Sequence, residues 1–207
     1  MNDSNSERNA QAVSRRKLLA LMGIYAAPLL AAWIWFAYVS SHEGAGVSVN
    51  GELIVPAVPL EKFDLVDGRG TAWPLQNLRE KWSMVYFSGP VCDDPCEKNL
   101  YNMRQVRLST GRRMDRVQRI LVTTDVDAMD GKLAQASEGL AVVGGSIEQV
   151  QTLKRQILKA QDGMGACEKC IYLVDPFGNV MMRFPPELEP GRIYKDLKHL
   201  LKVSRIG

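Results

Sequence analysis

The most constraining feature of this sequence is a long uncharged run near its amino-terminal end. No Asp, Glu, Lys or Arg occurs from Leu18 to His42, and residues 18–40 are mostly aliphatic or aromatic. About 22 residues in a helix rise ~33 Å, which is enough to cross a hydrocarbon layer of ~30 Å. Pro28 lies inside the run, where membrane helices tolerate it. The sequence therefore predicts a transmembrane helix over residues 18–40.

Charges beside this predicted helix indicate its orientation. Arg15, Arg16 and Lys17 precede it, whereas the first residues after it carry no basic charge. Basic residues favour the cytoplasmic side, so we expect residues 1–17 to be a cytoplasmic tail. The rest would then be periplasmic, held by a single-pass anchor in the inner (plasma) membrane. Residues 14–19 also resemble a twin-arginine export signal, which makes cleavage the alternative; the length of the apolar run favours an uncleaved anchor.

Beyond the predicted anchor, the composition is that of an ordinary globular protein. Residues 41–50 predict a short linker, and residues 51–207 suffice for one domain with its own core. The hydrophobic share is 46% and the net charge is +3, which argues against a disordered chain and a nucleic-acid binder. The chain has two histidines, too few for most histidine-rich metal sites. Gly144 and Gly145 lack a following phosphate-loop pattern, so nucleotide binding is unsupported.

Apolar runs and helical periods alternate along this predicted domain. The predicted strands are residues 63–66, 82–88, 117–124, 141–143, 171–174 and 180–184, and the predicted helices are residues 95–108, 146–160 and 192–203. Strands separated by helices imply an α/β fold, in which a sheet with parallel members is covered by helices on both faces.

The four cysteines form two close pairs at the ends of predicted elements. Cys92 and Cys96 lie at the turn from the second predicted strand into the first predicted helix. Backbone N–H groups at a helix N-terminus favour the thiolate form of cysteine. Cys167 and Cys170 lie just before the hairpin, in a loop that can pack beside that helix. Four thiols in one region can exchange disulfides or share a soft metal ion such as Cu(I).

These motifs resemble the Sco/SenC family, which consists of membrane-anchored, thioredoxin-like copper proteins of cytochrome c oxidase assembly. The resemblance rests on C-x3-C at this strand-to-helix turn, on Tyr-Leu-Val-Asp-Pro at residues 172–176, and on the anchor. It covers residues 50–203. It implies a thioredoxin-like mixed sheet, copper as the metal, and an oxidase subunit or another copper or thiol assembly protein as the partner.

The sequence departs from the family pattern at one ligand. Sco proteins bind copper with two cysteines and a histidine five residues before the hairpin tyrosine, and that place is Cys167 here. The resemblance therefore implies that Cys92 and Cys96 hold Cu(I), that Cys167 replaces the histidine, and that Cys170 is an auxiliary ligand or a resolving thiol. Three thiolates suit Cu(I), but Cu(II) less well because it oxidises thiolates.

Two other functions stay open at this point. A membrane-tethered thiol–disulfide oxidoreductase would use a thiolate of Cys92 or Cys96 to attack a Cys167–Cys170 disulfide, and would reduce acceptor cysteines before metallation. The C-x3-C motif differs from the C-x2-C of thioredoxins, and Lys169 and Cys170 take the approximate place of their cis-proline. A non-catalytic scaffold is the third reading, and it predicts that all four cysteines are dispensable.

Other conspicuous side chains have simpler explanations. Asp93 and Asp94 are expected to interact with the N-terminus of the first predicted helix rather than to catalyse a reaction. Met164 is a candidate thioether ligand of Cu(I), with loop packing favoured. A basic group follows that helix and is expected to be solvated, with docking to an acidic partner as the weaker alternative: Arg112, Arg113, Arg116 and Arg119.

Overall fold

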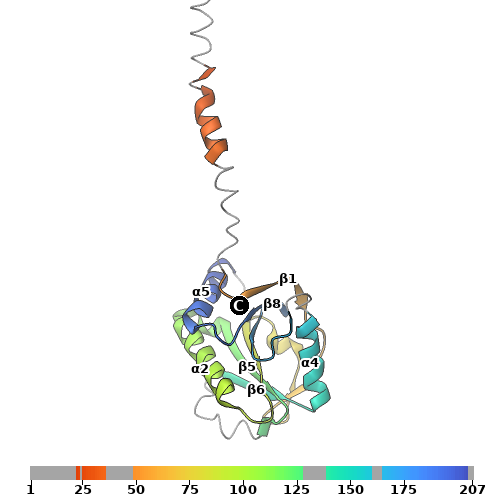
Figure 1. Ribbon diagram of the computed structural model, residues 1–207. Coiled ribbons are helices and arrows are strands. Elements are labelled where there is room, and N and C mark those ends of the chain that lie inside the picture. Colours follow the sequence, from red (N-terminus) through yellow and green to blue (C-terminus); the bar gives the residue numbers. More distant parts are fainter. Residues whose placement is uncertain (1–21, 24, 36–48, 128–138, 160–164, 205–207) are drawn as a thin grey trace, which may run out of the picture. The chain divides into compact units, whose positions relative to one another are not determined.

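The computed structural model describes residues 22–23, 25–35, 49–127, 139–159 and 165–204 (Figure 1). They belong to two units, residues 1–48 and residues 49–207. In the first unit, residues 25–35 are helical and exposed. Among the described residues, no helix is both long and apolar enough to cross a membrane. The predicted tail, both ends of the predicted anchor, residues 41–48 and Met164 lie outside the described residues, so the anchor stays a prediction.

A mixed sheet forms the centre of the second unit. Its described strands are β1 (Glu52–Pro59), β2 (Leu65–Asp67), β3 (Ala72–Trp73), β4 (Trp82–Phe87), β5 (Val117–Thr123), β6 (Leu140–Gly144), β7 (Ile171–Val174) and β8 (Asn179–Phe184). They lie in the order β1-β8-β7-β4-β5-β6-β2-β3. Strands β4, β5 and β6 are parallel, and β7 is antiparallel to β4. The predicted parallel members and the predicted hairpin are thus confirmed.

Helices cover both faces of this sheet. They are α2 (Asp94–Ser109), α4 (Ile147–Lys159) and α5 (Pro190–Val203), joined by the short 3-10 helices η1 (Leu75–Leu78) and η2 (Gly111–Arg116). Helices α2 and α5 lie on one side of the sheet and α4 on the other (Figure 1). The three predicted helices are confirmed, and Ser146 begins α4 as an N-cap, since its hydroxyl accepts from the Gln149 N–H at 3.3 Å.

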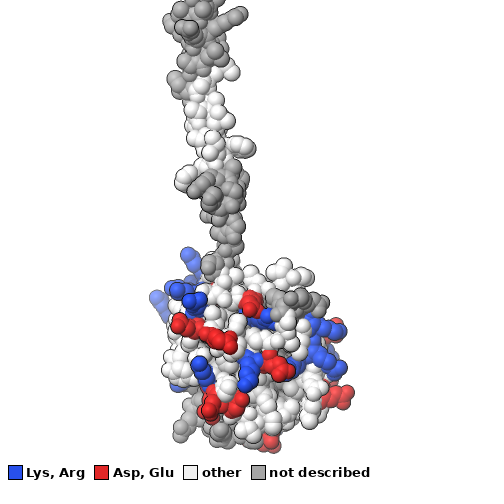
Figure 2. Space-filling view, viewed as in Figure 1, with Lys and Arg blue, Asp and Glu red and all other residues white. Residues whose placement is uncertain are grey.

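Two hydrophobic clusters fill the space between sheet and helices. Met84 and Tyr86 of β4 point into the cluster under α2 and α5, whereas Val85 and Phe87 point into the cluster under α4. Because successive side chains of a strand alternate between faces, a strand covered on both faces is apolar throughout. Both clusters lie within residues 49–207, so this unit has a core of its own. Charged side chains of both signs are interspersed on its surface (Figure 2).

The expectation that the whole basic group is solvated is wrong for Arg119. Its side chain is 1% exposed, and its Nη1 donates to the carbonyl of Leu100 in α2 at 3.4 Å. Arg119 lies two residues from the buried Val117 and Leu121 on β5, so the strand alternation directs it under α2. Arg112 and Arg113 of η2 are exposed, as expected, whereas Arg116 is half-buried and donates to the carbonyl groups of Leu201 and Ser204.

A buried carboxylate holds the start of the domain. Asp196 of α5 accepts from the backbone N–H groups of Asn50 and Gly51, both at 2.8 Å, and from the Asn50 side-chain amide at 2.8 Å. A Cβ on Gly51 would lie 2.6 Å from the ring of Phe184, so only glycine fits there without displacement. Asn50 and Gly51, which lead into β1, are therefore fixed to α5.

Candidate thiol site

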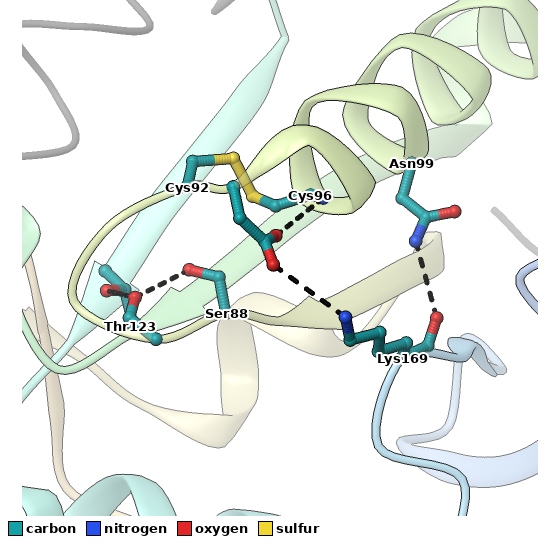
Figure 3. Close-up of a disulfide and its surroundings, with 8 residues drawn as sticks. Ser88, Cys92, Cys96, Asn99, Thr123 and Lys169 are labelled. Atoms are coloured by element: carbon teal, nitrogen blue, oxygen red, sulfur yellow. Dashed lines mark hydrogen bonds and ion pairs between the residues drawn. A yellow bond between two sulfur atoms is a disulfide. The ribbon is translucent and has the colours of Figure 1, made fainter.

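The turn from β4 to α2 is fastened to the neighbouring strand. The hydroxyl of Thr123, at the end of β5, donates to the carbonyl of Gly89 at 2.9 Å (Figure 3). The N–H of Ser88 donates to the carbonyl of Val122 at 2.9 Å. Since β4 and β5 are central parallel strands, these bonds give the cysteine-bearing turn a rigid base.

Asp93 begins helix α2. It has extended backbone angles, and its Oδ1 accepts from the N–H of Cys96 at 3.0 Å. Pro95 follows within the first helical turn, where its missing N–H costs no helical hydrogen bond. The predicted role of Asp93 at the helix N-terminus is therefore confirmed, and it fixes the backbone between the two cysteines.

Cys92 and Cys96 form a disulfide with a Cα–Cα distance of 5.2 Å. The two residues are 2% and 1% exposed and pack in the cluster under α2 and α5. The oxidised pair thus offers little sulfur surface to solvent, although the adjoining Val91 is well exposed.

Cys167 and Cys170 form a second disulfide, with a Cα–Cα distance of 5.5 Å. Cys170 is buried and Cys167 is half-buried, and both pack with the cluster under α4. The hydroxyl of Tyr172 donates to the carbonyl of Cys167. The tyrosine of the hairpin motif therefore holds the loop that carries the second pair.

The two cysteine loops touch each other, an arrangement that the sequence left open. The ammonium of Lys169 lies 3.8 Å from Oδ2 of Asp93, and the amide of Asn99 donates to the carbonyl of Lys169 at 3.4 Å (Figure 3). The disulfides nevertheless join cysteines within each motif and pack in different hydrophobic clusters. Within the described part of the chain, no three His, Cys, Asp or Glu side chains are grouped to hold a metal ion. The shared thiolate site stays a prediction.

A cavity of about 370 Å³ opens beside both loops. Val91 and Asp93 line it from the first loop, Lys169 from the second, and Ile147 and Lys154 from α4. Val91 and Ile147 are exposed apolar side chains. The cavity thus presents both apolar and charged side chains next to the two cysteine loops.

The phenol of Tyr86 lies under the first loop in a medium that disfavours its ionised form. Burial raises the pKa of Tyr86 above its usual 10.0, a hydrogen bond with Asn99 lowers it, and the carboxylate of Asp93 raises it further. The raised pKa keeps the phenol protonated over a wider alkaline range.

Sequence reasoning missed the part played by Lys169 and Asn99. The sequence contains one signal for Lys169. This cation lies between the cysteines of one motif, and two acids lie between the cysteines of the other. No sequence pattern marks Asn99, because only the packing of the hairpin loop against α2 reveals its contact.

The sequence comparison assigns a family. The model of the family described as "Transmembrane-like, thioredoxin-like, C-terminal domain" matches residues 82–204, which is more than half of the chain. The chain belongs to this family. The match begins at β4 and ends at α5, so it contains both cysteine pairs and the helices α2, α4 and α5. No curated protein sequence matches the chain significantly.

Solved structures with the same fold include Sco proteins. Yeast Sco1 with copper bound aligns with a TM-score of 0.59 at 18% identity, covering 72% of this chain and 95% of that one. Bradyrhizobium japonicum ScoI with copper bound gives 0.55 at 19% identity, covering 69% and 99%. BsSco, a member of the Sco family of cytochrome c oxidase assembly proteins with a disulfide switch, gives 0.55 at 15% identity, covering 72% and 96%. The thioredoxin-like fold expected from the Sco/SenC resemblance is confirmed.

Proposed function

We propose that this protein is a membrane-anchored copper-binding assembly factor for a respiratory cytochrome oxidase. The observation that carries the proposal is the position of Cys92 and Cys96, paired at the β4–α2 turn of a fold shared with copper-bound Sco structures. The uncharged run over residues 18–40 supports an inner-membrane anchor, with the domain in the periplasm.

The chemistry starts from the disulfide form. Each disulfide takes two electrons and two protons from an external thiol donor, so four electrons and four protons convert Cys92–Cys96 and Cys167–Cys170 into thiols. The thiols that bind Cu(I) then lose their protons. Cu(I) is a soft ion that prefers thiolates. Cys167 is the candidate third ligand, because Lys169 brings its loop against Asp93. Cys170 is an auxiliary ligand or a resolving thiol. Cu(I) leaves when cysteines of an oxidase subunit, or of another assembly protein, replace these ligands.

The test is an anaerobic titration of Cu(I) into reduced residues 44–207 against a competing chelator. We expect tight binding of one ion per chain, abolished in Cys92→Ser and Cys96→Ser. Cys167→Ser is expected to weaken binding by at least about tenfold, since even outer-shell partners of a metal contribute that much. Cys170→Ser is the matched comparison, because it also prevents the second disulfide but removes only the auxiliary position, so a smaller loss than in Cys167→Ser is expected. Failure of the wild-type protein to compete for Cu(I) would sink the copper proposal.

The second disulfide favours a second candidate function, a membrane-tethered thiol–disulfide oxidoreductase. A thiolate of Cys92 attacks the Cys167–Cys170 disulfide, a mixed disulfide forms, and the thiolate of Cys96 resolves it. This step produces the Cys92–Cys96 disulfide and a Cys167/Cys170 dithiol, so two electrons pass between the pairs. The dithiol then reduces an acceptor disulfide, and an external thiol protein restores the first pair.

Turnover on a disulfide-bonded peptide, with a dithiol as reductant, separates the two candidates. Turnover that persists with a Cu(I) chelator and is lost in both Cys92→Ser and Cys167→Ser supports the oxidoreductase. Absence of turnover together with tight Cu(I) binding supports the assembly factor. If replacement of all four cysteines left oxidase assembly intact in cells, the protein would be a scaffold and both proposals would fail.

A further inference from the structure

A second cavity lies away from the cysteines, between η2 and α5, and we propose that it binds a phosphate group. This inference is independent of the proposed copper or thiol function. The cavity measures about 520 Å³ and is lined by Thr110, Arg112, Arg113, Tyr194, Lys198 and Leu201. Three of these six side chains are cationic and none is acidic.

The two walls of this cleft are held in place by hydrogen bonds. The Nη1 of Arg116, in η2, donates to the carbonyl of Leu201 at 2.9 Å, and its Nη2 donates to the carbonyl of Ser204 at 2.9 Å. These bonds also satisfy carbonyl groups at the end of α5, which have no partner within the helix. The spacing between the cations of η2 and those of α5 is therefore set by the fold.

The cations of the cleft are available to an anion. Arg112 and Arg113 are exposed on η2, and the ammonium of Lys198 lies 5.5 Å from the ring centroid of Tyr194. Asp196, the nearest acid of α5 in sequence, faces the other way and is occupied by Asn50 and Gly51. Guanidinium groups match the planar, bidentate geometry of phosphate oxygens, which makes a phosphate ester the favoured anion.

The other polar groups of the cleft fit the same ligand. The hydroxyl of Thr110 donates to the carbonyl of Arg107 at 2.6 Å, so the donors left for an anion are the guanidinium groups, the ammonium and the phenol of Tyr194. Figure 2 shows Lys and Arg side chains, with Asp and Glu beside them, over the part of the surface where α5 lies. A neutral ligand would gain little from so many cations, whereas a phosphate gains from each.

Two sources can supply this phosphate, a lipid headgroup or a soluble phosphorylated molecule. The short segment before the domain favours the lipid source, because it ends at Asn50 and Gly51, which Asp196 fixes to α5. Residues 41–48 span at most ~29 Å when fully extended. If residues 18–40 cross the membrane, this tether keeps α5 within reach of the headgroups.

The experiment uses residues 44–207, which contain the complete core, in two arms. The first arm measures sedimentation with vesicles of phosphatidylglycerol in phosphatidylcholine, compared with phosphatidylcholine alone. The second arm measures calorimetric binding of inorganic phosphate and of glycerol 3-phosphate. The test variant is Arg112→Gln/Lys198→Gln. The matched control is Lys62→Gln/Arg155→Gln, which removes the same charge from exposed positions outside the cleft.

We expect binding to anionic vesicles to fall about 30-fold in the test variant, since each basic residue near an anionic surface contributes on the order of fivefold. The control is expected to lose less than about threefold, because screened, distant charges contribute little. If the wild-type protein binds glycerol 3-phosphate but not vesicles, and the test variant loses this binding, the site is assigned to a soluble phosphate ester. Binding in neither arm, or equal losses in test and control variants, would overturn the proposal.

Discussion

Lys169 lies between the cysteines of one disulfide, and its ammonium is 3.8 Å from the carboxylate of Asp93, which lies between the cysteines of the other. The same carboxylate caps α2 through the N–H of Cys96. One side chain therefore connects the start of the helix, the first cysteine pair and the loop of the second pair. The ion pair is exposed, with its side chains 56% and 61% accessible, so its own contribution to stability is small.

The first prediction separates the cap from the ion pair. Asp93→Ala removes both and is expected to lower the free energy of unfolding by ~1 kcal/mol, the usual effect of deleting an N-cap. Asp93→Asn keeps a capping side chain and is expected to lower it by less than ~0.5 kcal/mol. Urea denaturation of the oxidised residues 44–207 measures both values.

Lys169→Ala is the control for this prediction, since it removes the ion pair and leaves the cap. Its expected cost is at most ~0.5 kcal/mol, because exposed ion pairs contribute little. A cost for Lys169→Ala equal to that of Asp93→Ala would show that the contact between loops, rather than the cap, is the stabilising interaction.

The second prediction concerns the carboxylate that holds the start of the domain. Asp196→Ala leaves the N–H groups of Asn50 and Gly51 without their acceptor. Because an unsatisfied buried donor costs ~1–3 kcal/mol, we expect the free energy of unfolding to fall by about 3 kcal/mol. Proteolysis near residue 50 should also become faster. Asn50→Ala deletes only the side-chain bond and is expected to cost ~1 kcal/mol; an equal loss in both variants would contradict the role of the backbone donors.

The sequence predicts the central elements well because their patterns are strong. Strand β4 is buried on both faces and is apolar except for Ser83, and α2 begins at an Asp-Asp-Pro sequence that both caps and starts a helix. The candidate site follows from the same region, since Cys92 and Cys96 lie between these two elements. The pairing of each cysteine with its neighbour is not predictable, because four cysteines permit three connectivities.

Features that depend on distant contacts were not predictable. Strands β1 and β3 are missing from the prediction: β1 is an edge strand with Pro56 and much exposed surface, and β3 has two residues. Their hydrogen bonds to β8 and β2 define them, rather than their own composition. The prediction for Arg119 is wrong for the same reason. Its charge favours the surface, but its position on β5 places the side chain under α2.

The third prediction concerns Gly144, a glycine that is not followed by a nucleotide-binding loop pattern. A Cβ on Gly144 would lie 2.0 Å from the carbonyl oxygen of Thr123, in the strand that pairs with β6. Relief requires the strands to separate, so Gly144→Ala is expected to cost ~1–3 kcal/mol of unfolding free energy, as overpacking does. Gly191→Ala is the matched control, because a Cβ there meets nothing within 4 Å in helix α5 and should be neutral or slightly stabilising. Equal stability of the two variants would contradict the contact.

The last prediction concerns alkaline pH. Burial holds the pKa of Tyr86 above its usual 10.0, so above pH 10 the folded protein retains a phenolic proton that the unfolded chain releases. The stability due to this group is complete below pH 10 and is lost as the pH rises from 10 through the folded-state pKa. Urea denaturation from pH 8 to pH 11 should therefore show a steeper decline for the wild type than for Tyr86→Phe. Other tyrosines and lysines titrate in both proteins, so their difference isolates Tyr86, and parallel curves would contradict the raised pKa.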